Sequence, residues 1–156
     1  MHWVSAPLVG VDPALPEVAV RVERRQLARR RWRAAADDGA EFGFELDLPL
    51  AHGDVVWVSA GARYVMRQSA EPVLVIPLDG APAAAAVTGW IVGNLHFPVE
   101  AQPGRLLAPD ERALRRMLER IGIPYHDAVE CFQPHRLASV LIGAGHPTNH
   151  VHIHSR

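Results

Sequence analysis

The stretch EPVLVIPLDGAPAAAAVTGWIVGN, residues 71–94, decides how the second half of the chain folds. Four consecutive apolar residues, VLVI at 73–76, lie between two prolines, a pattern typical of a short buried strand. The alanine-rich segment 81–94 follows, and alanine has the highest intrinsic helix propensity. The stretch therefore predicts a buried strand followed by a helix.

A second helix is predicted at residues 110–121. Leu114 and Leu118 are four residues apart, which places them on one face of a helix. Glu111 and Arg115 have the same separation, and opposite charges at this spacing form an ion pair along a helix. We expect this helix to bury its leucines and to carry the ion pair on its outer side.

Extended pieces separate and follow these two helices. Residues 97–99 and 105–107 flank a turn at 103–104, and residues 125–132 supply a last strand. The complete order is strand, helix, strand, strand, helix, strand. This order is that of a ferredoxin-like βαββαβ domain.

The first half of the chain has the short alternating pattern of half-buried strands. Asp37-Asp38-Gly39 is a hairpin-type turn between two of them. The predicted strands are 17–23, 31–35, 41–46, 55–58 and 63–66. Because no helix of useful length is predicted among them, this half is expected to be a small all-β domain.

The fold class expected from these patterns is α+β. An N-terminal β domain covers 1–71 and begins with an irregular extension at 1–16. The ferredoxin-like domain covers 72–136. Residues 137–156 lose the periodic apolar pattern and are expected to form a flexible, histidine-containing tail.

Composition excludes several classes of protein. With 17 acidic and 16 basic residues, the formal net charge of -1 gives no global field that attracts nucleic acid or an anionic membrane. No signal peptide or long apolar run is present, so neither export nor membrane anchoring is expected. The single cysteine, Cys131, excludes an internal disulfide framework and is typical of a reducing compartment. We therefore expect a cytoplasmic protein.

The histidines are the residues that indicate a chemical function, which is metal binding. Nine are present, and four of them, His146, His150, His152 and His154, lie within the last eleven residues. Neutral imidazole is a ligand for nickel, zinc and copper, and a spacing of two residues puts rings on one side of an extended segment. The tail is thus a candidate metal-binding segment, although the sequence does not rank Ni(II) against Zn(II) or Cu(II).

Enzymatic readings are poorly supported by the sequence. No G-x-S-x-G elbow, P-loop or H-E-x-x-H motif occurs. Cys131 paired with His126 or His135 would make a nucleophile and a base, but a lone cysteine is more typically a small buried hydrophobe. For a hydrolase with a histidine-bound metal, this sequence offers no carboxylate base at a recognisable spacing. The expectation is a protein that is not an enzyme, with no catalytic residues.

An RNA-binding module is the alternative from another class. Residues 24–33 hold six arginines and Trp32, and arginine with an interleaved aromatic residue holds phosphates and stacks a base. However, Arg31 and Arg33 alternate with Trp32 as the solvent face of a strand does. The sheet of the second half also lacks the adjacent aromatic residues that RNA-binding sheets present.

Several short segments resemble the UreE urease accessory proteins. The segment GWIVGNLHFPV at 89–99 is similar to the helix end and G-N-x-H-x-P motif of that family, and 110–122 is similar to its second helix. The segments RRQ at 24–26, RWRA at 31–34 and HGDVV at 52–56 are similar to its β domain. The likeness covers roughly residues 17–136.

This resemblance implies a function and a set of residues. The family's motif histidine falls on His96, which by itself is more typical of a hydrogen-bonded structural residue, and becomes the expected central nickel ligand. The tail histidines named above become its auxiliary ligands, and zinc or copper is expected at the same side chains. The implied protein is a homodimer that delivers Ni(II) during urease maturation. Its implied partners are the urease apoprotein and other urease accessory proteins, including the GTPase, and its β domain is expected to contact other proteins.

Overall fold

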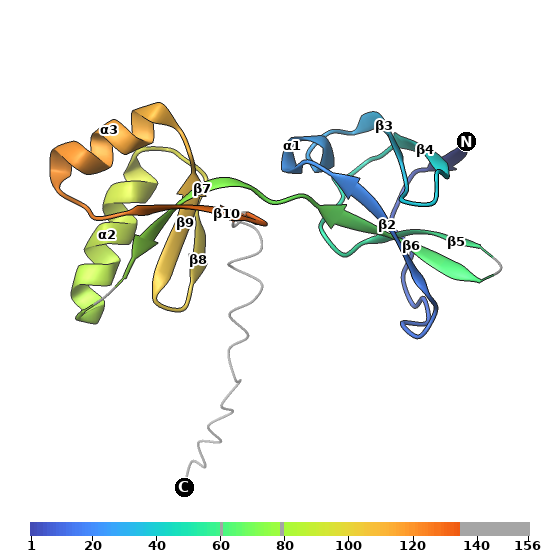
Figure 1. Cartoon of the computed structure of the whole chain (residues 1–156), viewed down its shortest axis with the longest axis horizontal. Helices are drawn as coiled ribbons and strands as arrows, with labels where there is room; N and C mark the ends of the chain where they lie inside the picture. Colours follow the sequence, from blue (N-terminus) through green and yellow to red (C-terminus); the bar gives the residue numbers. More distant parts are fainter. Residues whose placement is uncertain (60, 79, 135–156) are drawn as a thin grey trace, which may run out of the picture.

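The computed structural model describes residues 1–59, 61–78 and 80–134 and has a mixed α+β fold (Figure 1). The described elements follow in chain order. They are β1 (His2–Val4), β2 (Glu17–Val22), α1 (Arg24–Leu27), β3 (Arg31–Ala35), β4 (Glu41–Glu45), β5 (Val55–Ser59), β6 (Ala62–Gln68), β7 (Glu71–Pro77), α2 (Pro82–Asn94), β8 (Glu100–Gln102), β9 (Arg105–Pro109), α3 (Arg112–Ile121) and β10 (His126–Glu130).

The first half of the chain, up to Gln68, consists of two small sheets that enclose one apolar core. Their strand orders are β1-β4-β3 and β2-β6-β5. Alternate residues point inward, so that Phe42, Phe44 and Met66 are fully buried between the sheets. The short helix α1 was not expected from the sequence, and it occupies part of the arginine-rich stretch.

Strand β1 corrects the expectation that residues 1–16 are wholly irregular. It pairs in parallel with β4, with Trp3 opposite Gly43. A Cβ atom at position 43 would lie 2.9 Å from the Trp3 indole. The glycine thus leaves the space that the indole occupies against β4.

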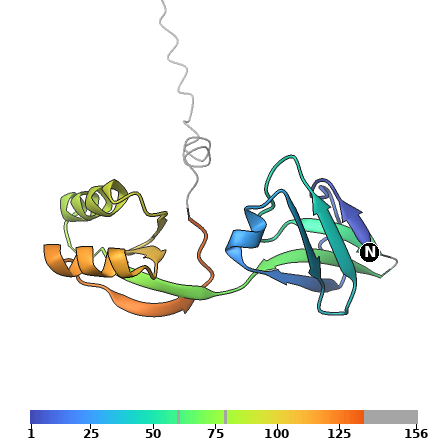
Figure 2. The ribbon, with the colours of Figure 1, turned by 90° about the horizontal axis from the view of Figure 1, so that it is seen from above.

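The second half has a four-stranded antiparallel sheet with the order β10-β7-β9-β8. Helices α2 and α3 both lie on one face of it, as Figure 2 shows. Leu74 and Ile76 of β7 point to that face and pack with Leu114 and Leu118 of α3. The leucine pair predicted to be buried is therefore confirmed.

The prediction of an ion pair between Glu111 and Arg115 along the second helix was wrong. The helix begins at Arg112, so Glu111 is its N-cap residue rather than part of its first turn. Arg115 instead pairs with Asp110 at 2.6 Å and with Asp127 of β10 at 2.8 Å. These two contacts tie α3 to the edge of the sheet. The strand expected at 97–99 also lies slightly later, at β8.

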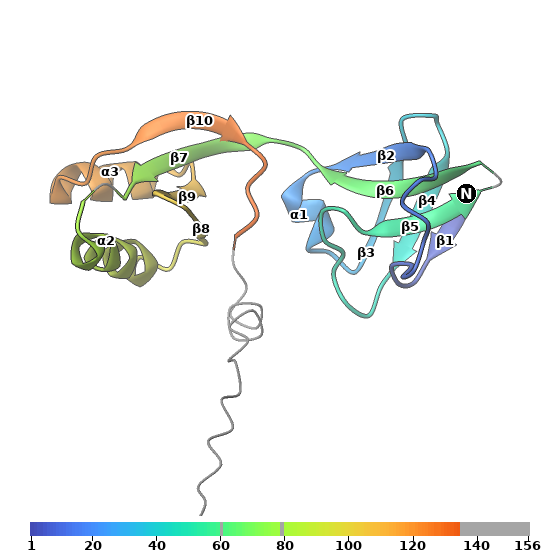
Figure 3. The same cartoon turned by 90° about the horizontal axis from the view of Figure 1, so that it is seen from below.

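The two halves meet where the chain returns after β10 (Figure 3), in a group of residues that we call the joint: Arg24, His52, Gln68, Cys131 and Phe132. The Phe132 ring is fully buried on the sheet face opposite the helices. The Gln68 side chain donates a hydrogen bond of 2.6 Å to the Phe132 carbonyl. The Arg24 guanidinium lies 5.0 Å from the centre of the Phe132 ring. One aromatic residue therefore contacts both halves.

Arg115 gives a prediction about pH. Its hydrogen bonds to Asp110 hold the pKa of that carboxyl below its ordinary value of 3.8. A carboxyl whose pKa is lowered by folding stabilises the fold above its ordinary pKa, and that stabilisation is lost as pH falls through the lowered value. Arg115→Gln should therefore lower the melting temperature at neutral pH, with a difference that shrinks as the pH falls below 3.8.

Arg116 provides the control for this measurement, because it is exposed and the described residues offer it no ion pair. Arg116→Gln should leave the melting temperature close to that of the parent protein at every pH. Equal effects of the two substitutions at neutral pH would show that the Arg115 contacts add nothing to stability.

Candidate functional site

His96 directly follows the last turn of α2. It is the residue after the C-cap Leu95, and its N–H donates to the Gly93 carbonyl at 3.1 Å. Its φ angle is 60°, the only positive value of a non-glycine residue in the described part of the chain. This left-handed conformation usually belongs to glycine and costs a residue with a side chain about 1 kcal/mol. Such strained positions cluster at functional sites.

The His96 imidazole faces solvent while its neighbours are held by the core. Leu95, Phe97 and Val99 are partly buried and pack against the cluster beneath the helices. His96 itself is exposed. Among the residues that the structure describes, none makes a hydrogen bond or an ion pair with its ring. Within the described residues, the exposed side chain thus lacks the partners of a structural histidine.

Helix α2 presents an uncovered apolar surface next to this histidine. Apolar residues occur on all its sides, yet Val92 is its one buried residue. Val87 and Trp90 are 55% and 69% exposed. Large apolar side chains that remain exposed together typically mark a surface that contacts another protein.

In the described part of the chain, His96 belongs to no cluster of metal-ligating side chains. Within residues 1–59, 61–78 and 80–134, no group of three or more His, Cys, Asp or Glu side chains is placed to hold a metal ion. The four predicted tail ligands, His146, His150, His152 and His154, lie outside the described residues. The described part of one chain therefore contributes one exposed imidazole, an incomplete ligand set.

Cys131 has a partner that sequence reasoning missed. Its Sγ lies 3.7 Å from Nδ1 of His52, and the thiol is partly exposed rather than a buried hydrophobe. Proximity in sequence had suggested His126 and His135 as partners of Cys131. His52 is 79 residues away and was interpreted only as part of a turn, so no local pattern predicts this contact.

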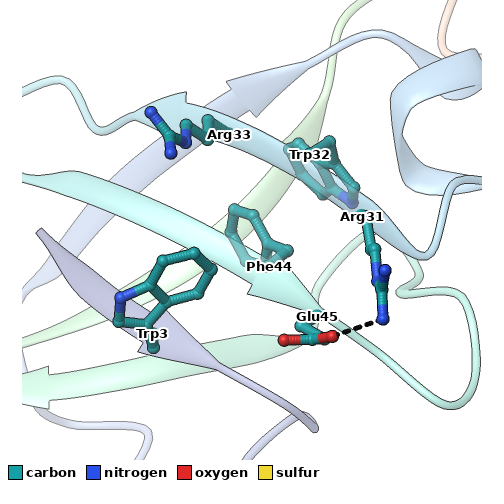
Figure 4. A pocket seen from close by; sticks show the side chains of 6 residues that line it. All are labelled: Trp3, Arg31, Trp32, Arg33, Phe44 and Glu45. Carbon is teal, nitrogen blue, oxygen red and sulfur yellow. Dashed lines mark ion pairs between the residues drawn. The ribbon is translucent and has the colours of Figure 1, made fainter.

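The arginine-rich strand lines a cavity of about 260 Å³ on the first half (Figure 4). Trp32 stacks on Phe44, with ring centres 4.0 Å apart. Arg31 is paired with Glu45 at 2.6 Å. A single-stranded nucleic acid needs free aromatic faces and free cations. Here one face of the indole is covered and one arginine is paired, which favours packing as the role of these residues.

None of the helices in the described part of the chain combines the length and the apolar character that a membrane span requires.

Comparisons with known proteins agree in pointing to one family. The family model described as "UreE urease accessory protein, C-terminal domain" matches residues 71–156. The "Urease accessory protein UreE" of Rhodobacter capsulatus is 35% identical over 97% of this chain and 94% of its own length. The proteins of the same name from Deinococcus radiodurans and Rhizobium meliloti are 33% and 27% identical, over 78% and 94% of this chain and 77% and 91% of their own lengths.

Proposed function

The chain belongs to the UreE family of urease accessory proteins, and from this premise we propose that it is a metallochaperone that delivers Ni(II) during urease maturation. It acts as a carrier rather than as an enzyme. Nickel is its cargo, and zinc or copper binds at the same histidines. Its partners are the urease apoprotein and other urease accessory proteins, including the GTPase, in the cytoplasm.

The observation that carries this proposal is the setting of His96. Its imidazole is exposed, and its neighbours on both sides are anchored in the core. Imidazole is a suitable ligand for Ni(II). A carrier must also release its ion, so an open and incomplete ligand set serves delivery better than a closed cage.

A homodimer would make the incomplete site functional. In a two-fold dimer, a residue close to the axis meets its own copy, so that two His96 imidazoles would hold one ion. The exposed Val87 and Trp90 of α2 support a dimer contact on this side of the molecule, because they would be covered there. We propose that His146, His150, His152 and His154 then supply further ligands.

The same proposal assigns a separate role to each of three segments of the chain. Residues 1–71 are proposed to form the partner-contacting β domain. Residues 72–136 are proposed to be a ferredoxin-like metal-binding domain, which the antiparallel strand order β10-β7-β9-β8 supports. Residues 137–156 are proposed to be the histidine-containing arm.

Trp90→Glu tests the shared site. A charge on the proposed contact surface should weaken dimerisation by about 2 kcal/mol or more, which corresponds to more than tenfold in the dissociation constant. Nickel affinity should fall in parallel, because separated chains present one His96 each. Light scattering and calorimetry with nickel measure the two effects on the same samples.

Leu48→Glu is the matched control, since Leu48 is 75% exposed but lies in the first half of the chain. It should change neither the molecular mass in solution nor the nickel affinity. A parent protein that is monomeric with nickel present would rule out the shared site, and so would a Trp90→Glu protein that remains dimeric with full affinity.

A further inference from the structure

The sheet β1-β4-β3 holds an exposed tryptophan that is fixed in place. Trp3, Gly43 and Arg33 are neighbours across the three strands, so these positions share the outer face of the sheet, opposite the core. The Trp3 side chain lies across Gly43, since a Cβ atom there would be 2.9 Å from the six-membered ring of the indole. Trp3 is nevertheless 59% exposed. The sheet therefore presents a positioned aromatic surface to solvent.

Arg33 is a cation on the same outer face without a partner among the described residues. Arg31, two residues earlier on β3, is paired with Glu45 at 2.6 Å. Arg33 is exposed, and neither an ion pair nor a side-chain hydrogen bond joins it to another residue that the structure describes. A guanidinium presents its N–H donors in a planar fork that matches a carboxylate. This side chain is therefore available to bind an acidic group.

Two cavities follow each other along β3, and Arg33 lines both. The first is the cavity of about 260 Å³ in Figure 4, lined by Trp3, Arg31, Trp32, Arg33, Phe44 and Glu45. The second, of about 210 Å³, is lined by Met1, Arg33, Ala34, Ala35, Glu41 and Phe42. Both are smaller than the pockets of roughly 300 Å³ or more that hold small-molecule ligands. Their succession suits two side chains of an extended segment, in which alternate residues lie about 7 Å apart.

The charges around the two cavities determine which side chain each would accept. Two arginines and one glutamate line the first cavity, whereas Arg33 and Glu41 line the second. A carboxylate therefore fits the first cavity, where its oxygens can accept hydrogen bonds from Arg33 next to the Trp3 indole. In the second cavity Glu41 would repel an acid. An apolar side chain fits there instead, against Ala34 and Phe42.

We propose that this outer face binds an extended segment of a partner protein in which an Asp or Glu lies two residues from a large apolar side chain. The inference rests on the proposed function only in that residues 1–71 contact partners, and it does not involve nickel. A single-stranded nucleic acid fits less well, because Glu41 and Glu45 line the cavities and would repel its phosphates.

A labelled, amidated octapeptide, in which serine alternates with glutamate and leucine in turn, tests the proposal by fluorescence anisotropy with the full chain. We expect saturable binding without added nickel. The same peptide with glutamine in place of glutamate should bind about tenfold more weakly, because it loses the charge-assisted hydrogen bonds to Arg33.

Three variants locate the binding on the outer face. Arg33→Gln should weaken binding of the glutamate peptide about tenfold and leave that of the glutamine peptide unchanged. Trp3→Ala should weaken both by about tenfold or more. Gly43→Ala should act like Trp3→Ala, because the added methyl group displaces the indole without removing it. Arg29→Gln is the matched control and should bind normally, since Arg29 is exposed and lines neither cavity.

The proposal would be overturned by a parent protein that shows no saturable binding, by equal binding of the glutamate and glutamine peptides, or by undiminished binding in Arg33→Gln and Trp3→Ala. Displacement of the peptide by an equal concentration of a thymidine oligonucleotide would show instead that the face takes nucleic acid. Because no readout involves nickel or His96, failure here is distinguishable from failure of the proposed nickel delivery.

Discussion

His96→Ala is expected to abolish the tightest nickel site while the protein remains folded and dimeric. The side chain is exposed, so its removal opens no cavity, and alanine meets the same backbone strain at φ 60°. Each chain contributes one imidazole to a shared site, so the substitution removes two ligands from each ion. Loss of outer-shell partners alone costs a metal site 10 to 100-fold in affinity, so the loss of two direct ligands should cost more than about 100-fold. Competition calorimetry with nickel measures it.

The same site should respond steeply to acid. Imidazole binds a metal only when it is neutral, so protons compete with the ion for each ligand. With two copies of His96 on one ion, acid should lower the nickel affinity more steeply than it would at a site with a single imidazole. His126→Ala is the control and should follow the parent protein. An unchanged tight site in His96→Ala, or pH-independent binding in the parent, would remove His96 from the mechanism.

Phe132→Ala is expected to have the largest effect on stability. The ring is fully buried against Val73, Val75 and Leu107, and it also contacts Arg24 from the other half. Truncation of a buried phenylalanine costs about 3–5 kcal/mol through lost transfer free energy and the cavity that remains. Urea denaturation should show this as a lower midpoint.

Val129→Ala is the matched control for that experiment, because Val129 lies on β10 nearby but is 69% exposed. Its effect should stay within about 0.5 kcal/mol, as for most surface substitutions. If Phe132→Ala lowers the free energy of unfolding no more than Val129→Ala does, then the packing of Phe132 does not stabilise the protein as described.

The parts of the fold that the sequence predicts are those in which local pattern and burial agree. The run VLVI at 73–76 lies within β7 because all four residues are buried, and the alanine-rich segment becomes α2. The predicted leucine face of α3 follows from the same agreement, since Leu114 and Leu118 meet the sheet. In each case, one short segment contains the whole signal.

The parts that the sequence does not predict depend on residues far apart in the chain. Strand β1 exists through its pairing with β4, about forty residues later, and its three residues have no pattern of their own. Arg115 pairs with Asp110 and Asp127 rather than with Glu111, because the helix begins at Arg112 and not at the predicted residue 110. Helix ends are set by such local competition, which residue spacing alone does not resolve.

The candidate site likewise has a part that the sequence predicts and a part that it does not. His96 was expected from the likeness of 89–99 to a family motif, whereas its left-handed backbone and its exposure are visible only in the fold. The contact of His52 with Cys131 has no sequence signal, since it depends on how the two halves meet. Metal binding by His96, and the contribution of the tail histidines, remain predictions.

The number of nickel ions bound tightly per chain tests the central claim most directly. Calorimetry is carried out on the full chain with Asn at 146, 150, 152 and 154, so that weak tail sites do not contribute. A site shared by two His96 side chains predicts one tightly bound nickel ion for every two chains, and none when His96→Ala is added. One tight ion on each chain, or a tight ion that persists without His96, would contradict the account.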